Sequence, residues 1–518
     1  MGIVRNTFTV GIFTLLSRIA GFLRECLMAF CLGASPYSDA LLIAIRIPNT
    51  FRRIFAEGAF NASFLPRFSK IFYDKGKKQA NDVLSDVFSG LLLILIPFSM
   101  IIMTIFPSFL RLLVSGFDLL SEKFRLTVAL GRICFPYLIL ISLTSLFGGV
   151  LNTINKFALA SAIHSLLSVF IIVGLLIGYF CDMSNSAVVH MVAWSVLLSG
   201  VAQSYLLFIS IEKKEFRLNF RLHCLTDTVK DVMKNMIPGI IGAGVWQLNL
   251  LIDITISSYL PTGSITCINL ADRLTQFPLG TLGIALSTAL LPLLIKHITK
   301  KEYDLAMFAL EKGLLFAFFL TFFATSILMA LSEQAVAVAF QRGMFEVEQV
   351  RITVQAVKGF AIGLPAYVLT KVFSTIYFAT GDTRSPVIFG IASIILNVLF
   401  LLLLVPIFKY FGLALCTSLS AISNAAMLMY FSRRKIPIKF TKEFWLRVTA
   451  QIVAAFVTYF STSKLADQYW NPDWGAQGIK WFAFLAMLML AGLLFLMITV
   501  VCLFICGHPR WQLWKKDV

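Results

Sequence analysis

The sequence predicts an all-α polytopic membrane protein with about fourteen transmembrane helices. Of its 518 residues, 58% are hydrophobic and only 14% are charged, whereas a soluble domain carries about 25% charged residues. Apolar runs of roughly 18–25 residues, long enough to cross a bilayer, recur along the whole chain. Every backbone polar group in lipid must be hydrogen-bonded internally, so these runs are helices. The short alternating segments of a transmembrane barrel do not appear.

The apolar runs define the expected helices in order. An even number of them places both termini on the same side of the membrane. The predicted spans are 7–33, 37–60, 84–113, 126–152, 157–180, 186–211, 232–260, 266–296, 304–332, 352–380, 385–407, 411–432, 443–465 and 478–506. The first is expected to be an uncleaved helix, because Arg18 and Arg24 interrupt its apolar stretch and no small-residue cleavage site follows.

Lysine and arginine in the short loops predict the orientation, because such residues are retained in the cytoplasm. The opposite loops, 33–37, 181–185, 261–265 and 466–477, carry almost none. We therefore expect a multi-pass membrane protein with both termini in the cytoplasm. The basic residues on the cytoplasmic side are Arg67, Lys70, Lys75, Lys77, Lys78, Lys213, Lys214, Arg217, Arg221, Lys296, Lys300, Lys301, Arg433, Arg434, Lys435, Lys439, Lys442, Arg510, Lys515 and Lys516.

The basic segment 212–231 divides the predicted helices into two groups of six. This segment is either a solvated linker or a stretch that lies along the inner membrane surface. Many transporters are built from two repeated groups of helices, as the two groups of six would be here. The expected organisation is an N-terminal lobe at 1–211, a cytoplasmic linker at 212–231, a C-terminal lobe at 232–432, two further helices at 443–506 and a cytoplasmic tail at 507–518.

Composition also excludes several classes of function. The formal net charge of +18 would suggest nucleic acid for a soluble protein, but here most basic residues lie in short loops, so no nucleic-acid partner is expected. The nine cysteines form no CxxC motif and no Cys/His cluster, so we predict no metal, no disulfide framework and no bound cofactor.

Charged residues inside the first apolar run are the main anomaly. An ion at mid-membrane costs about 2.5–3.5 kcal/mol on insertion scales, so it is tolerated when it faces a wet cavity or a partner. Arg18 and Glu25 are seven residues apart and share a helical face, and Ser17 and Arg24 follow the same spacing. One carboxylate facing two guanidinium groups favours an anionic ligand. Snorkelling or internal salt bridges are the alternative.

The second apolar run carries a similar stripe. Asp39, Arg46 and Arg53 are each seven residues apart and share one helical face. Arg53 and Glu57 are an i, i+4 pair near the inner end, so an internal ion pair is an equally good account of them. The polar residues of this run that we expect to support a cavity are Asp39, Asn49, Arg53 and Glu57, with Arg52 facing the ligand.

The eighth run contains Asp272 and Arg273, followed by Gln276, Pro278 and Gly280. Proline and glycine at this depth are expected to break the helix, and broken helices often line transport sites.

Four intramembrane arginines, Arg18, Arg24, Arg52 and Arg273, thus form the candidate ligand-binding set. The guanidinium fork suits bidentate phosphate recognition. The sequence shows no HExxH, GxSxG or P-loop and no paired catalytic carboxylates, so it favours a transporter over an enzyme. A drug-cation exporter would have a carboxylate-rich cavity. Two classes of function remain open at this point. One is an exporter of a lipid-linked oligosaccharide, and the other, less readily, is a membrane enzyme acting on polyprenyl phosphates.

Three stretches resemble the MurJ/MviN family of bacterial lipid II flippases. They are 17–24 (SRIAGFLR) with Ser38-Asp39-Ala40, 47–60 (IPNTFRRIFAEGAF) and 271–280 (ADRLTQFPLG). Phe135-Pro136-Tyr137, Leu151-Asn152 and 381–386 (GDTRSP) also fit, although the last is shared across the wider exporter superfamily. The resemblance covers nearly the whole chain.

The resemblance implies two six-helix lobes around a central cavity, with helices 443–506 flanking a groove for a polyprenyl tail. It implies lipid II, an undecaprenyl diphosphate bearing a disaccharide-pentapeptide, as substrate, moved by alternating access in a monomer among membrane lipids. The family's cavity arginines fall on Arg18, Arg24, Arg52 and Arg273. The resemblance also assigns supporting roles to Asp39, Glu57 and Lys371, and Asp272 belongs to the same motif.

The sequence departs from the family pattern in three places. Glu25 stands where Asp is common, and Gln276 stands where some relatives have Glu. Some members bind sodium, and Asp253 with Asn397 resembles that site, but Leu401 replaces a second acidic ligand. The energy source is therefore expected to be a coupling ion or the membrane potential, without a choice between them.

Overall fold

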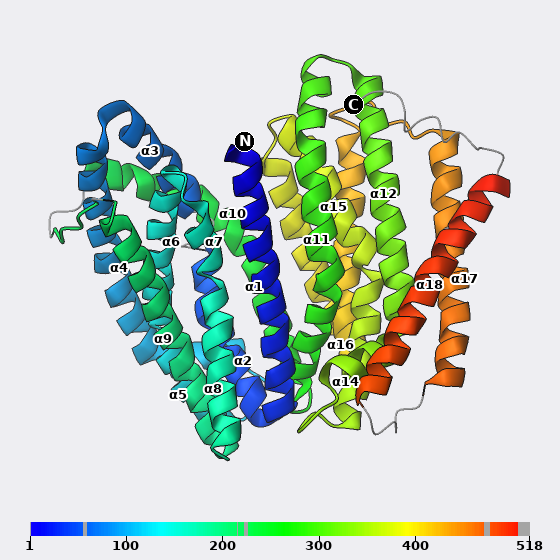
Figure 1. Cartoon of the computed structure of the whole chain (residues 1–518), viewed down its shortest axis with the longest axis horizontal. Coiled ribbons are helices and arrows are strands. Elements are labelled where there is room, and N and C mark those ends of the chain that lie inside the picture. The colour runs from blue at the N-terminus through cyan, green and yellow to red at the C-terminus, as the bar shows by residue number, and fades with distance from the viewer. Residues whose placement is uncertain (1, 55–59, 215, 222–225, 471–476, 506–518) are drawn as a thin grey trace. The chain divides into compact units, whose positions relative to one another are not determined.

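The computed structural model describes residues 2–54, 60–214, 216–221, 226–470 and 477–505. Among these residues it has eighteen α-helices and no strand (Figure 1), which confirms the predicted all-α fold class. Eight helical segments in this part of the chain are long and apolar enough to cross a membrane. They are Lys77–Leu113, Glu122–Thr153, Asn185–Glu212, Tyr303–Ala330, Val347–Ala379, Arg384–Ser432, Lys442–Tyr469 and Lys480–Cys502.

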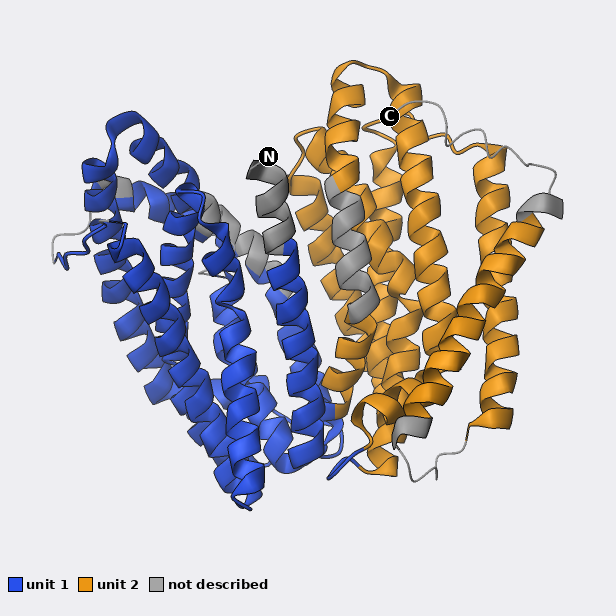
Figure 2. Ribbon diagram, viewed as in Figure 1, with its two compact units in different colours: residues 1–266, 342–345 blue, residues 267–341, 346–518 orange. Residues whose placement is uncertain are grey.

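The chain divides into two compact units (Figure 2). The first comprises residues 1–266 and 342–345, and the second comprises 267–341 and 346–518. The first unit therefore continues past the expected lobe boundary at residue 211, while the two functional lobes stay a prediction. Its helices are α1 (Gly2–Leu32), α2 (Pro36–Arg52), α3 (Phe60–Lys75), α4 (Lys77–Leu113), α5 (Glu122–Cys134), α6 (Tyr137–Thr153), α7 (Phe157–Ala162), α8 (Ser165–Phe180), α9 (Asn185–Glu212) and α10 (Asp227–Ser257).

The second unit begins within α11 (Ser264–Thr299), at residue 267. A buried apolar cluster joins α11, α12 and α15 with the end of α16 and the start of α17. The C-terminal helices pack on α12, where Phe319 and Phe323 contact Phe495 of α18. The remaining helices are α12 (Tyr303–Ala330), α13 (Ser332–Phe340), α14 (Val347–Ile362), α15 (Leu364–Ala379), α16 (Arg384–Ser432), α17 (Lys442–Tyr469) and α18 (Gln477–Ile505).

Several predicted spans are interrupted helices. The span 126–152 is α5 and α6, separated at Phe135-Pro136, because proline has no N–H to continue the helical ladder. The span 352–380 is α14 and α15, which meet at Gly363. A Cβ there would lie 2.5 Å from Ser418 Oγ, so the close approach of α16 requires glycine. Two predicted spans share the single element α16, which turns at Lys409 with φ 48° and ψ −118°.

The structure has a helix, α3, that the sequence analysis missed. α2 begins with a capping box between Ser35 and Ser38, and its α-helical part ends at Arg52. Residues 53–54 continue as a π-helix, and residues 55–59 of the predicted span 37–60 lie outside the described residues. α3 follows, and its Phe60, Phe64 and Phe68 stack one turn apart with ring centroids 5.1 and 5.2 Å from each other. This four-residue aromatic period was visible in the sequence and is typical of a buried helical face.

Residues 216–221, part of the expected linker, pack on α4. Arg221 donates to Asp82 at 2.7 Å and to Asp86 at 3.1 Å. The Arg221 N–H donates to Ser89 Oγ at 2.9 Å, and Phe216 is buried in the cluster that contains the α3 phenylalanines. The start of α10 joins the same cluster, and Asp231 accepts a hydrogen bond from Arg67 of α3. The segment therefore ties α10 to the first unit.

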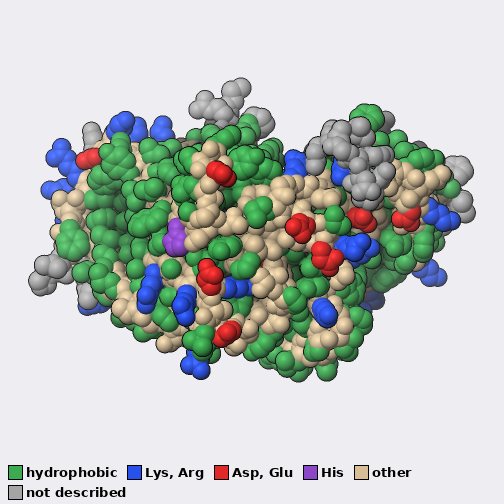
Figure 3. All heavy atoms as spheres, turned by 90° about the horizontal axis from the view of Figure 1, so that it is seen from below, with side chains coloured by type: hydrophobic (Ala, Val, Ile, Leu, Met, Phe, Trp, Pro, Cys, Tyr) green, Lys and Arg blue, Asp and Glu red, His purple; other side chains and the backbone are tan. Residues whose placement is uncertain are grey.

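Large apolar side chains are exposed along many helices, as expected of surfaces that meet lipid. Phe180 is 78% exposed and Phe482 is 77% exposed. On the face seen in Figure 3, Asp and Glu side chains are interspersed with Lys and Arg among mostly apolar atoms. This face therefore carries both acidic and basic side chains, whereas the loops singled out in the sequence are predominantly basic.

Candidate functional site

The charged residues predicted at the centre of helix 1 lie in the described part of α1. Arg24 Nη2 lies 2.5 Å from Glu25 Oε1, and their side chains are 15% and 3% exposed. Arg18 and Ser17 are half-buried. Arg18 also interacts with other groups of the protein. The pair with Glu25 holds the Arg24 guanidinium in place while leaving other donors of its fork available.

The three residues of the stripe predicted on helix 2 differ in burial. Asp39 is fully buried, Arg46 is half-buried and Arg53 is exposed. Asn49 and Arg52 are half-buried, and the buried Oδ1 of Asn49 has no hydrogen-bond partner among the residues that the structure describes. Arg46, Arg52 and Arg53 each interact with other groups of the protein. Glu57, the predicted partner of Arg53, lies outside the described residues.

Asp39 is the most completely coordinated of the predicted residues. Its Oδ1 accepts from the Thr266 N–H at 2.9 Å and the Thr266 hydroxyl at 2.7 Å. Its Oδ2 accepts from the Gly263 N–H and the Lys123 ammonium, both at 2.7 Å. Two of these donors belong to the backbone at the start of α11, so Asp39 acts as a cap donated by α2 to another helix. Both oxygens of the Asp39 carboxylate therefore accept hydrogen bonds from groups within the protein.

Lys123 and the Gly263–Thr266 turn were not predicted as site residues. Lys123 lies in the first turn of α5, and its ammonium also lies over the Phe117 ring, 4.1 Å from its centroid. No local pattern predicts this partnership, because Lys123 is 84 residues from Asp39 and Thr266 is 227 residues from it. A loop that approaches the same end of the unit contains Met344, whose N–H donates to Phe30 O at 3.0 Å.

In α11, the Gln276 amide donates to Asp272 Oδ2 at 2.6 Å, one turn apart. Asp272 is half-buried and Arg273 is exposed. Arg273 has interactions of its own, and it belongs to the second unit, whereas the other three candidate arginines belong to the first. The side chains of 277–288 lie outside the described residues. α11 nevertheless continues across Pro278 and Gly280, so the break expected there does not end the helix; helices in membranes tolerate proline when neighbouring groups satisfy the released carbonyl.

The remaining candidates are spread over both units. Lys371 of α15 is half-buried and engaged by other groups. Asp253 of α10 is half-buried in the first unit, and its carbonyl accepts from the Ser257 hydroxyl. Asn397 of α16 is fully buried in the second unit, one turn from the buried Leu401. Within the described ranges, no three His, Cys, Asp or Glu side chains converge as a metal site would require. The ion site stays a prediction.

The described part of the site offers cationic groups inside long apolar helices and no catalytic constellation. Guanidinium groups held at fixed places in a low-dielectric setting recognise phosphate oxygens well. Such groups bind an anion without changing its covalent bonds, and this suits transport.

Comparison with known proteins agrees with this chemistry. The family model described as "Lipid II flippase MurJ" matches residues 28–485. The chain is 35% identical over 436 residues to "Probable lipid II flippase MurJ" of Rickettsia prowazekii, covering 84% of this chain and 85% of the relative. It is 33% identical to "Lipid II flippase MurJ" of Burkholderia cenocepacia, covering 88% of each chain.

Solved structures support the fold. The structure "Lipid II flippase MurJ, inward closed conformation" superposes with a TM-score of 0.81 and 23% identity, covering 96% of this chain and 99% of the other. An inward-facing multidrug resistance MATE family transporter of the MOP superfamily superposes with a TM-score of 0.70 and 13% identity, covering 81% of this chain and 94% of the other. With a family match over most of its length, the chain belongs to the lipid II flippase MurJ family.

Proposed function

We propose that this protein flips lipid II from the cytoplasmic to the periplasmic leaflet of the bacterial inner membrane, with both termini in the cytoplasm. Its relatives carry the name lipid II flippase, and the match extends over most of both chains. The observation that supports the proposal best is Arg24, a guanidinium only 15% exposed on a helix of the first unit. It gives an anionic headgroup a charged contact where lipid would otherwise surround it.

In this mechanism Arg18, Arg24, Arg52 and Arg273 bind the diphosphate, and Ser17, Asn49 and Lys371 line its surroundings. Glu25 orients Arg24 through the 2.5 Å contact. The polyprenyl tail stays in lipid along the groove of α17 and α18, and the protein works as a monomer by alternating access. The membrane potential favours outward movement of an anion, by about 2.3 kcal/mol per charge per 100 mV. A coupling ion at Asp253 and Asn397 is a second possible energy source.

The test uses cells that depend on this chain. After depletion, a membrane-impermeant probe reports how much lipid II reaches the periplasmic face. The intact chain and Arg351→Ala, which alters an arginine with a side chain 74% exposed, should restore exposure. Arg24→Ala and Arg273→Ala should not. Normal translocation in depleted cells would reject the function, and full rescue by both cavity variants would reject the assigned residues.

A further inference from the structure

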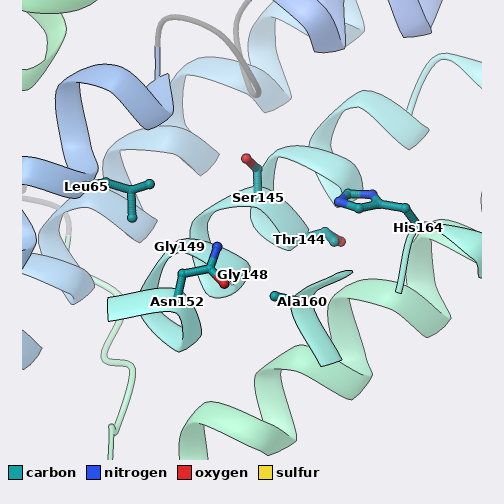
Figure 4. Close-up of a pocket in the computed structure, with 8 residues that line it drawn as sticks. All are labelled: Leu65, Thr144, Ser145, Gly148, Gly149, Asn152, Ala160 and His164. Carbon is teal, nitrogen blue, oxygen red and sulfur yellow. The ribbon is translucent and has the colours of Figure 1, made fainter. Parts of the chain in front are cut away.

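The first unit contains a small pocket that the proposed diphosphate site does not use. Its volume is about 260 Å³. α6 supplies five of the lining residues, and α3, α7 and the junction before α8 supply the others. The lining residues are Leu65, Thr144, Ser145, Gly148, Gly149, Asn152, Ala160 and His164. Figure 4 shows the Ser145 hydroxyl, the Asn152 amide and the His164 imidazole around this space, with Leu65 on the far side from His164.

The pocket has a buried floor and an accessible entrance. Thr144 is 1% exposed, and Gly148 and Gly149 are buried beside it. His164 is exposed, so a molecule reaches the floor by passing the imidazole. A site for a drug-sized ligand measures about 300–1,000 Å³, so this pocket has room for one small ring and not for a complete headgroup.

The lining chemistry selects a neutral ligand with several hydroxyl or amide groups. The eight residues include no carboxylate, lysine or arginine. Asn152 offers two donors and an acceptor oxygen. The Thr144 hydroxyl donates to Leu140 O at 2.9 Å, and its oxygen can also accept. Ser145 and His164 have other interactions within the protein and add further polar groups to the lining. The small Gly148, Gly149 and Ala160 leave flat apolar surface against which the C–H face of a ring can lie. This combination differs from the cationic groups on α1 and α2.

α9 adds a further amide near the same floor. A Cβ on Gly148 would lie 3.9 Å from Leu207 of α9, so this face of α9 approaches the pocket. Gln203 is one turn earlier on that face. It is fully buried, and neither its amide nitrogen nor its amide oxygen has a hydrogen-bond partner among the described residues. Burying an amide without partners is unfavourable, which favours a polar group close by.

We propose that this pocket binds one neutral sugar ring bearing an N-acyl group. The proposal rests on the proposed function, because a lipid-linked disaccharide presents such rings. The sugar site lies on α3, α6 and α7 of the first unit and is distinct from the arginines that bind the diphosphate. It gives the transporter a means to distinguish a glycosylated polyprenyl diphosphate from an unglycosylated one.

The first experiment measures sugar binding to the purified full chain with isotope-labelled histidine. The His164 ring signal is assigned by its loss in His164→Gln, and the probe is N-acetylglucosamine, with glycerol and inorganic diphosphate for comparison. We expect a saturable shift with the sugar only. Ala160→Phe fills the pocket and should weaken binding at least about 10-fold. Leu159→Phe, a neighbour on α7 with a side chain 37% exposed, should bind as the wild type does.

A second variant tests the sugar site independently of whether Ala160→Phe folds. Asn152→Leu keeps the side-chain volume and removes the amide, so it should also weaken binding about 10-fold while thermal unfolding stays unchanged. Absence of a sugar-dependent shift in the wild type, or equal binding by Asn152→Leu, would overturn the sugar site. Lipid II translocation without sugar binding rejects only this pocket, whereas sugar binding without translocation rejects only the proposed flippase activity.

Discussion

Replacing Asp39 with asparagine should destabilise the first unit strongly. The substitution keeps the shape of the side chain but places an amide NH₂ where the carboxylate accepts from four donors. It also leaves the Lys123 ammonium, only 13% exposed, without its carboxylate. Removing one partner of a buried ion pair costs about 3–5 kcal/mol. The contact of Lys123 with the Phe117 ring is present before and after the substitution and does not offset this loss, so we expect a loss of about 3–5 kcal/mol.

The assay is thermal unfolding of the purified protein in detergent, followed by the reaction of newly exposed cysteines with a fluorogenic thiol probe. Tm changes by roughly 2–4 °C per kcal/mol for a unit of this size, so Asp39→Asn should lower Tm by at least about 6 °C. The matched control is Glu348→Gln, since its 3.8 Å contact with Arg351 joins side chains 72% and 74% exposed, and Tm should hardly move.

A double variant tests the stated cause. Asp39→Asn with Lys123→Met removes the stranded ammonium, so its Tm should lie above that of Asp39→Asn alone. Equal Tm values for Asp39→Asn and Glu348→Gln would refute the reasoning, because Asp39 would then contribute no more than an exposed carboxylate.

Three further predictions follow from other contacts. Arg221→Ala should speed trypsin cleavage after Lys214 and Arg217, because it releases the segment from Asp82 and Asp86, and an unchanged rate relative to Arg351→Ala would contradict the docking. The Lys435 ammonium, 2.9 Å from Asp382, together with Ser385 lowers the pKa of that loop carboxyl. The resulting stability is complete above the unfolded pKa of about 3.9 and is lost as pH falls through the lower folded pKa. The Tm difference between the wild type and Lys435→Met should therefore be constant above about pH 5 and narrow towards pH 3. The Tm difference between the wild type and Lys439→Met should not narrow in this range. Lys409→Gly should raise Tm, because φ 48° with ψ −118° strains a lysine by about 1–3 kcal/mol, whereas Ile407→Gly should lower it.

The sequence by itself determined the fold class, most helix positions and the family. These features depend on local quantities, namely the length of an apolar run, the position of a proline and the identity of residues in short motifs. The interruption at Pro136 and the aromatic period of α3 could both be read from neighbouring residues. The arginines of α1 stood out because a charge within an apolar helix is costly wherever the rest of the chain lies.

Only the tertiary structure decided which polar groups engage one another. Asp39 was predicted as a cavity residue from its spacing to Arg46, but its contacts with the start of α11 and with Lys123 could not be predicted. The sequence likewise did not predict that residues 216–221 pack along α4. The pocket beside Asn152 likewise unites three helices. A hydrogen bond needs two groups within about 3 Å, and helix periodicity defines the face on which a residue lies but not the partner that this face meets.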